Sequence, residues 1–372
     1  MRAALSAALG LCALTSVVQA ALPPVRHVFV LLLENESFER SFGPGSPAPY
    51  LARALPRRGA LLREYYAIGH ASLPNYLALV SGQAPNEVTQ DDCPQFLEFE
   101  AATGSPDEHG QLHGRGCVYP RTLPTLMSQL EAVGLSWKGY MEDMGADPTR
   151  EAAACGHVPI GARDVTEEAT ANDQYANKHD PFVYFHAVID DSARCAERVV
   201  NLRQLPQDLR TLGSTPNFVF ITPNLCDDGH DAPCADGRPG GLRSIDAFLR
   251  HWVPLIESAP AFRADGMLII TFDESNGGGP AGAAACCGER ALPEARFPPG
   301  LNGPGGGRVG ALVLSRFVRP GTVSRTPYNH YALLRTVELL FGLAPIGYAA
   351  DPQLRPFGPD VFSAAAQHPL VR

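Results

Sequence analysis

Three strongly apolar runs divide the chain, and each ends abruptly in polar residues. They are RHVFVLLL at 26–33, NFVFIT at 217–222 and MLIITF at 267–272. Runs of this length are typical of buried strands and are too short to cross a membrane. The pattern therefore predicts central strands of a sheet that is covered on both faces.

Segments with helical spacing of apolar residues lie between these strands. We expect helices near 47–55, at 73–82, within 122–134, near 190–202, at 241–258 and at 330–342, and further strands near 60–66, at 136–141 and at 308–314. This alternation predicts an α/β fold with a mostly parallel central sheet and helices on both faces. Residues 84–121 and 145–180 are polar and irregular, and we interpret them as insertions in one domain that spans 21–372.

The polar residues that follow the apolar runs are of the types that bind ligands. Glu34-Asn35 follows the first run, Asp273-Glu274 follows the last, and a loop that contains His230 follows the run at 217–222. In open α/β sheets, ligands bind at the carboxyl ends of the strands. Clustered carboxylates repel one another, and a divalent cation with hard oxygen ligands relieves that repulsion. The alternative is that each polar pair only begins a loop.

Ser72 stands where a loop runs into a predicted helix. Pro74 suits a first helical position, and Leu73, Leu77 and Val80 recur at helical spacing. A hydroxyl at the start of a helix lies near unpaired backbone N–H groups and the positive end of the helix dipole, which favour phosphate. Taken alone, the segment favours a structural role for Ser72 as an ordinary N-cap. The acidic groups on other segments favour a catalytic one.

Six motifs in order resemble one known family. They are Glu34-Asn35-x-Ser37-Phe38, SLPNY at 72–76, KHDPF at 178–182, PNLCDDGHD at 223–231, TFDE at 271–274 and TPYNHY at 326–331. Together they resemble the secreted phosphoesterases, a family of bacterial acid phosphatases and non-haemolytic phospholipases C within the alkaline phosphatase superfamily. The resemblance runs from about residue 25 to 342 and implies an alkaline-phosphatase-like three-layer sandwich.

The resemblance also implies roles for individual residues. Ser72 would be the nucleophile that carries the phosphoryl group. One divalent metal ion of unknown identity would be held by Glu34, Asn35, Ser72, Asp273 and Glu274. The histidines that would contact phosphoryl oxygens or move the proton are His179 and His230, with His330 as a further active-site histidine.

Two positions depart from the family pattern. Asp180 stands where the family usually has Asn, and the segment Asp227-Asp228-Gly229 differs from the common Asn-Asp-Met. An additional acid beside His179 would be expected to raise the pKa of that histidine. A histidine that must be cationic to protonate the leaving alcohol would favour acidic conditions, since free histidine titrates near pH ~6.5.

The N-terminus and the cysteines indicate export. Residues 1–20 combine Arg2, an apolar stretch and the small-residue site Val18-Gln19-Ala20, which is the pattern of a signal peptide. Eight further cysteines in an exported chain predict disulfides. A Cys226–Cys234 bridge would close a small loop around His230, whereas the adjacent Cys286 and Cys287 would be expected to bond to different partners. We expect a secreted or periplasmic protein with no later membrane span.

Charge and chain length limit the partners. The formal net charge is −9, and no run of basic residues offers a nucleic-acid surface. The resemblance implies a phosphate ester as the substrate, with a lipid headgroup as one option. The sequence favours a phosphomonoesterase over a phospholipase C because the chain ends soon after the last motif. Two other functions stay open: a catalytically inactive binding protein on the same scaffold, and a sulfatase, which the lack of Arg at position 76 disfavours.

Overall fold

The computed structural model describes residues 22–276, 281–290, 292–296 and 303–363. Within these residues an eight-stranded sheet has the order β11-β2-β10-β9-β1-β8-β6-β7. Its strands are β1 (His27–Leu33), β2 (Ala60–Leu62), β6 (Trp137–Met141), β7 (Val199–Asn201), β8 (Phe218–Thr222), β9 (Gly266–Phe272), β10 (Ala311–Ser315) and β11 (Thr322–Ser324). The described residues add two small two-stranded sheets, β3 (Tyr65–Tyr66) with β12 (Tyr328–Asn329) and β4 (Glu100–Ala101) with β5 (Gly114–Arg115).

Strand β1 is the centre of the sheet. It pairs in parallel with β8 on one side and with β9 on the other, in a register that sets Leu31 opposite both Ile221 and Ile270. All seven residues of β1 are buried, because helices cover both faces of the strand. Since β1, β8 and β9 run in one direction, their carboxyl ends meet at the same edge of the sheet. Only β10 runs against its neighbours in the described part of this sheet, so the predicted mostly parallel α/β fold is confirmed.

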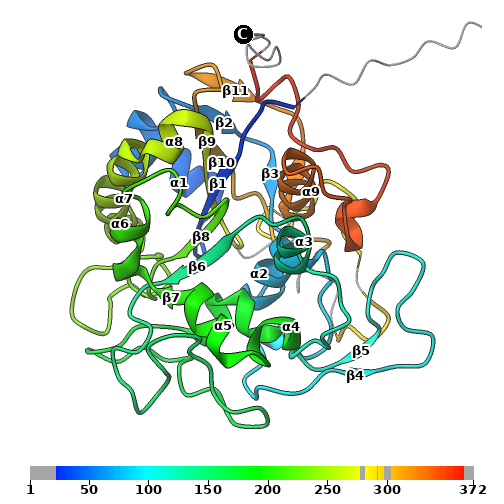
Figure 1. The fold of residues 1–372 in the computed structure, drawn as a ribbon. Helices are drawn as coiled ribbons and strands as arrows, with labels where there is room; N and C mark the ends of the chain where they lie inside the picture. Colours follow the sequence, from blue (N-terminus) through cyan, green and yellow to red (C-terminus); the bar gives the residue numbers. More distant parts are fainter. Residues whose placement is uncertain (1–21, 277–280, 291, 297–302, 364–372) are drawn as a thin grey trace, which may run out of the picture.

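Helices cover the two faces of the sheet, as Figure 1 shows. Helices α7 and α8 lie on one side of the sheet, and α2, α3 and α9 lie on the other. The described α-helices are α1 (Phe38–Phe42), α2 (Ser72–Ser81), α3 (Leu126–Ala132), α4 (His186–Ile189), α5 (Ser192–Arg198), α6 (Leu205–Asp208), α7 (Gly241–Ser258), α8 (Pro260–Asp265) and α9 (His330–Leu340). All ten residues of α2 are buried, so its position against the sheet is fixed by packing along its whole length.

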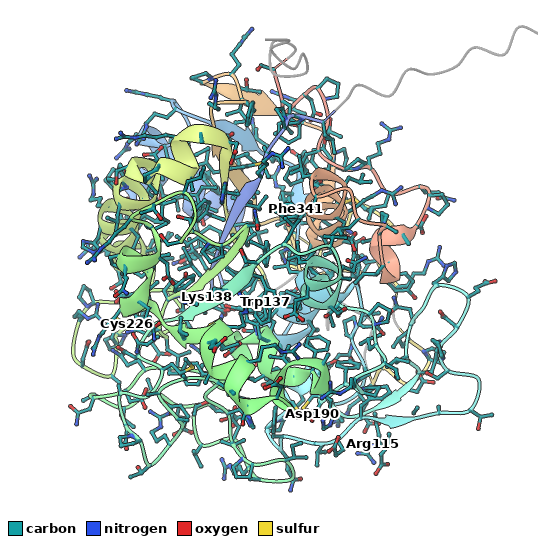
Figure 2. The ribbon with its side chains drawn as sticks, viewed as in Figure 1. Arg115, Trp137, Lys138, Asp190, Cys226 and Phe341 are labelled. Atoms are coloured by element: carbon teal, nitrogen blue, oxygen red, sulfur yellow. A yellow bond between two sulfur atoms is a disulfide. The ribbon has the colours of Figure 1, made fainter. Side chains whose placement is uncertain are left out.

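Strand β6 illustrates how side chains alternate between the faces of the sheet. Trp137 is 1% exposed and stacks on Phe182 at a centroid distance of 4.9 Å. The next residue, Lys138, donates to Asp208 at 2.8 Å (Figure 2). A second lysine–aspartate pair of this kind lies at the functional site described below.

Three predicted elements differ from the structure. The segment near 47–55 forms only a short π-helix, η1 (Tyr50–Ala54), and the Asp246 carboxylate accepts the N–H groups of Tyr50 and Leu51 at its start. The strand near 60–66 is split into β2 and β3, which pair with different strands. The helix near 190–202 ends at Arg198, and Val199–Asn201 forms β7 instead, since its two buried valines complete the sheet beside β6.

The eight cysteines of the described residues form four disulfides. The pairs are Cys93–Cys117, Cys155–Cys195, Cys226–Cys234 and Cys286–Cys287. Cys226 and Cys234 are the local pair that the sequence favoured. The expectation that Cys286 and Cys287 bond to separate partners is wrong, because these two neighbours are joined to each other.

The predicted signal peptide at 1–20 lies outside the described residues. Among the helices that the structure does describe, none combines the length and the apolar character needed to cross a bilayer.

Glu338 provides a test of the packing of α9. Its side chain is buried, one oxygen accepts the Ile346 N–H at 3.0 Å, and the other has no hydrogen-bond partner. Burial raises the pKa of Glu338 from 4.5 to about 8. The folded state therefore keeps this proton to a higher pH than the unfolded state, and the resulting stabilisation is full below pH 4.5 and is lost as the pH rises to about 8.

We expect Glu338→Gln to flatten the pH dependence of stability between pH 5 and 8. At pH 8 the variant should be more stable than the wild type by roughly 1–3 kcal/mol, because the amide keeps the acceptor and carries no charge. Urea unfolding at several pH values measures this change. Glu108→Gln is the control, since the Glu108 side chain is 88% exposed. Parallel stability curves for Glu338→Gln and the wild type would contradict the assignment.

Candidate active site

The candidate site begins where β1 ends. Glu34 follows the strand directly and is 0% exposed. Asn35 takes a left-handed backbone conformation (φ 55°), which turns the chain so that its backbone N–H donates to Asp273 Oδ1 at 3.0 Å. Because Asp273 follows the neighbouring strand β9, the paired ends of β1 and β9 bring the two acidic residues together. The carboxyl edge of the sheet thus gathers the residues that the sequence placed there.

Ser72 is the first residue of α2, and its hydroxyl points at Glu34. The Oγ–H donates to Glu34 Oε2 at 2.9 Å, and Ser72 is 2% exposed. The N-cap is Ala71, not Ser72, so the interpretation of Ser72 as an ordinary cap is wrong. Pro74 is accordingly the third helical residue rather than the first.

The turn before Ser72 is held by Asn75. Ala71 has φ 66° and ψ 147°, a combination that costs a non-glycine residue about 1–3 kcal/mol. The Asn75 side chain opposes this cost by donating to the carbonyl groups of Gly69 and Ala71, each at 2.9 Å, and by accepting the Ile68 N–H at 3.0 Å. This bonding gives Asn75 of the SLPNY motif a structural role in fixing the serine.

Glu34 accepts hydrogen bonds from three side chains of the site. Besides Ser72, it accepts from Tyr76 OH at 2.7 Å and from Asn35 Nδ2 at 3.1 Å. Burial raises the pKa of Glu34 well above its usual range, and the nearby carboxylates Asp273 and Asp228 raise it further. A buried carboxylate that faces two others is the arrangement that a bound cation stabilises.

His179 lies between Glu34 and Asp228. Its Nε2 is 3.3 Å from Glu34 Oε1, its Nδ1 is 3.1 Å from Asp228 Oδ2, and its ring stacks parallel on Tyr76. Burial lowers the pKa of His179 well below its usual value, and the charge of Lys178 lowers it further. The expected increase from Asp180 is wrong, because the Asp180 carboxylate turns away and accepts the Phe182 N–H at 3.1 Å.

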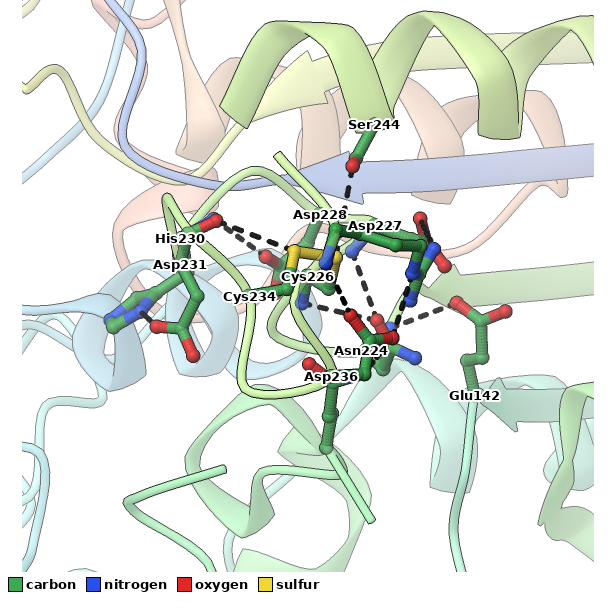
Figure 3. The surroundings of a disulfide bond; sticks show 12 residues. Glu142, Asn224, Cys226, Asp227, Asp228, His230, Asp231, Cys234, Asp236 and Ser244 are labelled. Atoms are coloured by element: carbon green, nitrogen blue, oxygen red, sulfur yellow. Dashed lines mark hydrogen bonds and ion pairs between the residues drawn. A yellow bond between two sulfur atoms is a disulfide. The ribbon is translucent and has the colours of Figure 1, made fainter. Parts of the chain in front are cut away.

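The loop after β8 carries Asp228 and His230 and is closed by the Cys226–Cys234 disulfide (Figure 3). The His230 backbone N–H donates to Asp228 Oδ1 at 2.7 Å, which aims the other oxygen of Asp228 at His179. The His230 ring pairs with Asp231 at 2.8 Å, and its side chain is 28% exposed. His230 is therefore the accessible histidine of the site, whereas His179 is buried.

Glu274 is engaged by a histidine that the sequence did not select. Its Oε2 pairs with His70 Nδ1, and the other ring nitrogen of His70 donates to the Gly282 carbonyl at 2.8 Å. Burial raises the pKa of Glu274 to about 7, although His70 opposes this. The position of His70, two residues before Ser72, was a signal for this contact.

His330 is buried next to the candidate site and bonds to the backbone of Asp273. Its Nε2–H donates to the Asp273 backbone carbonyl at 2.7 Å, and its Nδ1 accepts from Tyr65 OH at 3.0 Å. Burial lowers its pKa to about 4, so the ring is neutral at physiological pH. His330 contacts the Asp273 backbone, and none of its hydrogen bonds reaches Ser72 or Glu34.

These residues fit a divalent cation. Several buried atoms of the cluster have no hydrogen-bond partner in the described structure: Asp228 Oδ2, Asp273 Oδ2 and both ring nitrogens of His179. Ligand atoms of Glu34, His179 and Asp228 lie within 4.8 Å of one another, close enough to share one ion. Asp228 and His179 are thus further candidate metal ligands, and no sequence pattern distinguished Asp228 from its neighbour Asp227.

The chain is similar to proteins of one known family. Residues 46–344 match the Phosphoesterase family. A phosphatidylinositol-3-phosphatase of Mycobacterium tuberculosis is 26% identical over 331 residues, which cover 89% of this chain and 82% of that protein. A phosphate-repressible acid phosphatase of Penicillium chrysogenum is 26% identical over 315 residues, which cover 85% of this chain and 58% of the fungal protein.

A solved structure of similar fold is a protein in the alkaline phosphatase superfamily from Vibrio parahaemolyticus. The two structures superimpose with a TM-score of 0.52 at 12% sequence identity. The alignment covers 92% of this chain and 74% of the Vibrio chain. At this identity the similarity concerns the fold alone, and it confirms the predicted fold class.

Metal binding can be tested without any substrate. We expect at least one of Mg²⁺, Ca²⁺, Mn²⁺ and Zn²⁺ to raise the melting temperature of chelator-treated protein, because an ion that binds the folded state stabilises it by about 2.7 kcal/mol at 100 times its dissociation constant. Asp273→Asn should remove most of that increase. Asp180→Asn should retain it, since Asp180 is equally buried and points away from the cluster. Equal increases in both variants would exclude Asp273 as a ligand.

Proposed function

The chain belongs to the Phosphoesterase family, and on this basis we propose that it is an exported, metal-dependent phosphomonoesterase of the acid phosphatase type. The observation that supports this proposal most directly is the hydroxyl of Ser72, which starts a buried helix and is hydrogen-bonded to Glu34 among several acidic side chains. Such a hydroxyl has the placement that an activated nucleophile requires.

In the first proposed step, Ser72 Oγ attacks phosphorus and the bond from phosphorus to the alcohol oxygen breaks. Glu34 Oε2 already accepts the hydroxyl proton in a 2.9 Å hydrogen bond, so it is placed to receive that proton as the P–O bond forms. The departing alkoxide takes a proton from His230, whose ring is accessible and is oriented by Asp231. The products of this step are the alcohol and a phosphoserine.

In the second step, water attacks the phosphoserine and releases inorganic phosphate. His230, now unprotonated, removes the proton from the attacking water, and the Ser72 alkoxide recovers its proton from Glu34. His179 remains neutral and buried, with Glu34 and Asp228 on either side of its ring.

A divalent cation would be held by carboxylates of Glu34, Asp228 and Asp273, with Asn35, Ser72, His179 and Glu274 as further candidate ligands. When bound, it supplies charge neutralisation for the phosphoryl group and lowers the pKa of the serine hydroxyl. Phosphoryl transfer depends mainly on positioning of the reacting groups and on stabilisation of charge. Because this site is acidic, a bound cation would be needed to stabilise the negative charge of the phosphoryl group.

The relatives favour a monoester substrate. The two relatives described above are named as phosphatases, and phosphatidylinositol-3-phosphatase acts on a monoester carried by a lipid headgroup. A soluble monoester and a phosphorylated lipid headgroup are thus both candidate substrates. Phospholipase C activity on a diester is the alternative for the same residues.

A catalytically inactive binding protein is the alternative from another functional class. Replacement of Ser72 or of its acidic neighbours by other residues in this sequence would favour an inactive protein. The structure instead retains the Ser72–Glu34 hydrogen bond and the buried acids around it. The four disulfides support export to an oxidising compartment, either secreted or periplasmic.

Substitution of the nucleophile tests the proposal. We expect Ser72→Ala to lower kcat on p-nitrophenyl phosphate by at least about 10³-fold, since the covalent route is lost. Ser81→Ala is the matched control, because Ser81 is also buried in α2 and bonds only to the Leu77 carbonyl and the Gln83 N–H. Equal turnover by Ser72→Ala and the wild type would refute the role of Ser72.

The same assay separates the alternative substrates. Wild-type protein is compared on p-nitrophenyl phosphate, on its phosphorylcholine ester and on bis(p-nitrophenyl) phosphate, with and without a chelator. Preference for the monoester supports a phosphomonoesterase, whereas preference for the phosphorylcholine ester supports phospholipase C. No hydrolysis of any ester with the metals above supplied would favour the inactive binding protein.

A further inference from the structure

Lys178 is an unusual residue for the interior of this site. It is 8% exposed, and lysine side chains are seldom buried unless they are paired. Its Nζ donates to Asp92 Oδ2 at 3.0 Å. The mechanism described above makes no use of this ammonium group.

The Lys178–Asp92 pair is attached to the helix that carries the nucleophile. Asp92 Oδ1 accepts the N–H of Leu73, the residue after Ser72, at 2.9 Å. One carboxylate therefore bridges the start of α2 and the lysine ammonium. Lys178 also precedes His179, whose Nε2 lies 3.3 Å from Glu34, and the charges of Glu34 and Asp273 help to raise the pKa of the Lys178 ammonium.

The loop that presents Asp92 is itself constrained. Asp92 and Cys93 have φ values of 57° and 55°, both in the left-handed region, and Cys93 is bonded to Cys117. The segment was interpreted as an insertion at 84–121. In the structure it delivers a carboxylate to the first turn of α2.

The start of α2 offers few donors of its own to a phosphate. The Leu73 N–H is taken by Asp92, and Pro74 has no N–H. An ammonium carries three donors, and among the described residues Asp92 is the one acceptor that Nζ bonds. Two donors of a buried cation therefore remain for an incoming group, close to carboxylates that would otherwise repel an anion.

We propose that Lys178 binds a non-bridging oxygen of the phosphoryl group and that Asp92 positions it to do so. The inference rests on the proposed function, since it gives the same site a phosphate-binding cation. Lysine serves as a point charge for phosphate in many proteins. Here that charge would offset the repulsion between a phosphate ester and the acidic cluster around Glu34.

Phosphate binding provides the direct test. The increase in melting temperature produced by inorganic phosphate is measured alongside kcat and KM on p-nitrophenyl phosphate. We expect Lys178→Met to weaken phosphate binding by at least about 10-fold and to lower kcat/KM by about 10²-fold, and Lys178→Arg to restore part of both.

Two control variants separate phosphate binding from a structural role. Lys138→Met removes the lysine of a half-buried lysine–aspartate pair, Lys138–Asp208 at 2.8 Å, and should change neither phosphate binding nor kcat/KM. Asp92→Asn should lower the melting temperature and weaken phosphate binding by only about threefold, less than Lys178→Met does, since the ammonium is retained but is held less firmly. If Lys178 only pairs with Asp92, Lys178→Met and Asp92→Asn will both lower stability and leave phosphate binding unchanged, and the proposal is overturned.

A double variant covers the case in which Lys178→Met does not fold. Asp92→Asn with Lys178→Met leaves no unpaired buried charge, and its phosphate binding is compared with that of Asp92→Asn alone. Loss of phosphate binding in the double variant supports the proposal, and equal binding refutes it. Failure of the proposed function is distinguishable, because it would appear as equal turnover by Ser72→Ala and wild-type protein whatever the Lys178 variants do.

Discussion

The buried carboxylate of Glu34 is the constraint on which the site depends. Transfer of an ionised carboxyl group from water to the protein interior is costly unless other groups compensate the charge. Tyr76, Asn35 and Ser72 each donate a hydrogen bond to Glu34, and these donors come from the end of β1 and the start of α2. The same contacts that satisfy the carboxylate therefore fix the position of the serine hydroxyl.

The sheet supplies the rigid frame for this cluster. Because β8 and β9 flank β1 in parallel, the residues after these three strands emerge at one edge. The left-handed Asn35 then directs its N–H to Asp273, and the His230 N–H orients Asp228 toward His179. Backbone donors thus aim the acidic side chains, which keeps their unpaired oxygens directed at a shared centre where a cation would lie.

Long loops complete the site, and disulfides limit their motion. The Cys226–Cys234 bridge closes the loop of His230, and the Cys93–Cys117 bridge follows Asp92. A loop without regular structure loses much conformational entropy when it is ordered, and a covalent link reduces that loss. The catalytic groups proposed from these loops can therefore be held about as firmly as those at the ends of the strands.

The strand cores and the groups at their ends could be predicted from the order of residues. After His27, the six remaining residues of β1 are all apolar and buried, so the strand and the acidic residues that follow it were evident in the sequence. Ser72 stood out by its place before a predicted helix, and the resemblance to a family supplied its role as nucleophile and the roles of the histidines. Local patterns were weaker at 190–202, where pairing with β6 converted the end of a predicted helix into β7.

Which of these groups meet depends on how the whole chain folds. Asp228, rather than the adjacent Asp227, faces His179, because a backbone N–H two residues later holds it there. His70 pairs with Glu274, and Lys178 pairs with Asp92, across separations of 204 and 86 residues in the chain. Contacts between such distant positions arise from the register of the sheet and the course of the loops, and no local periodicity encodes them. For the same reason Asp180 lies next to His179 in sequence and yet points away from it.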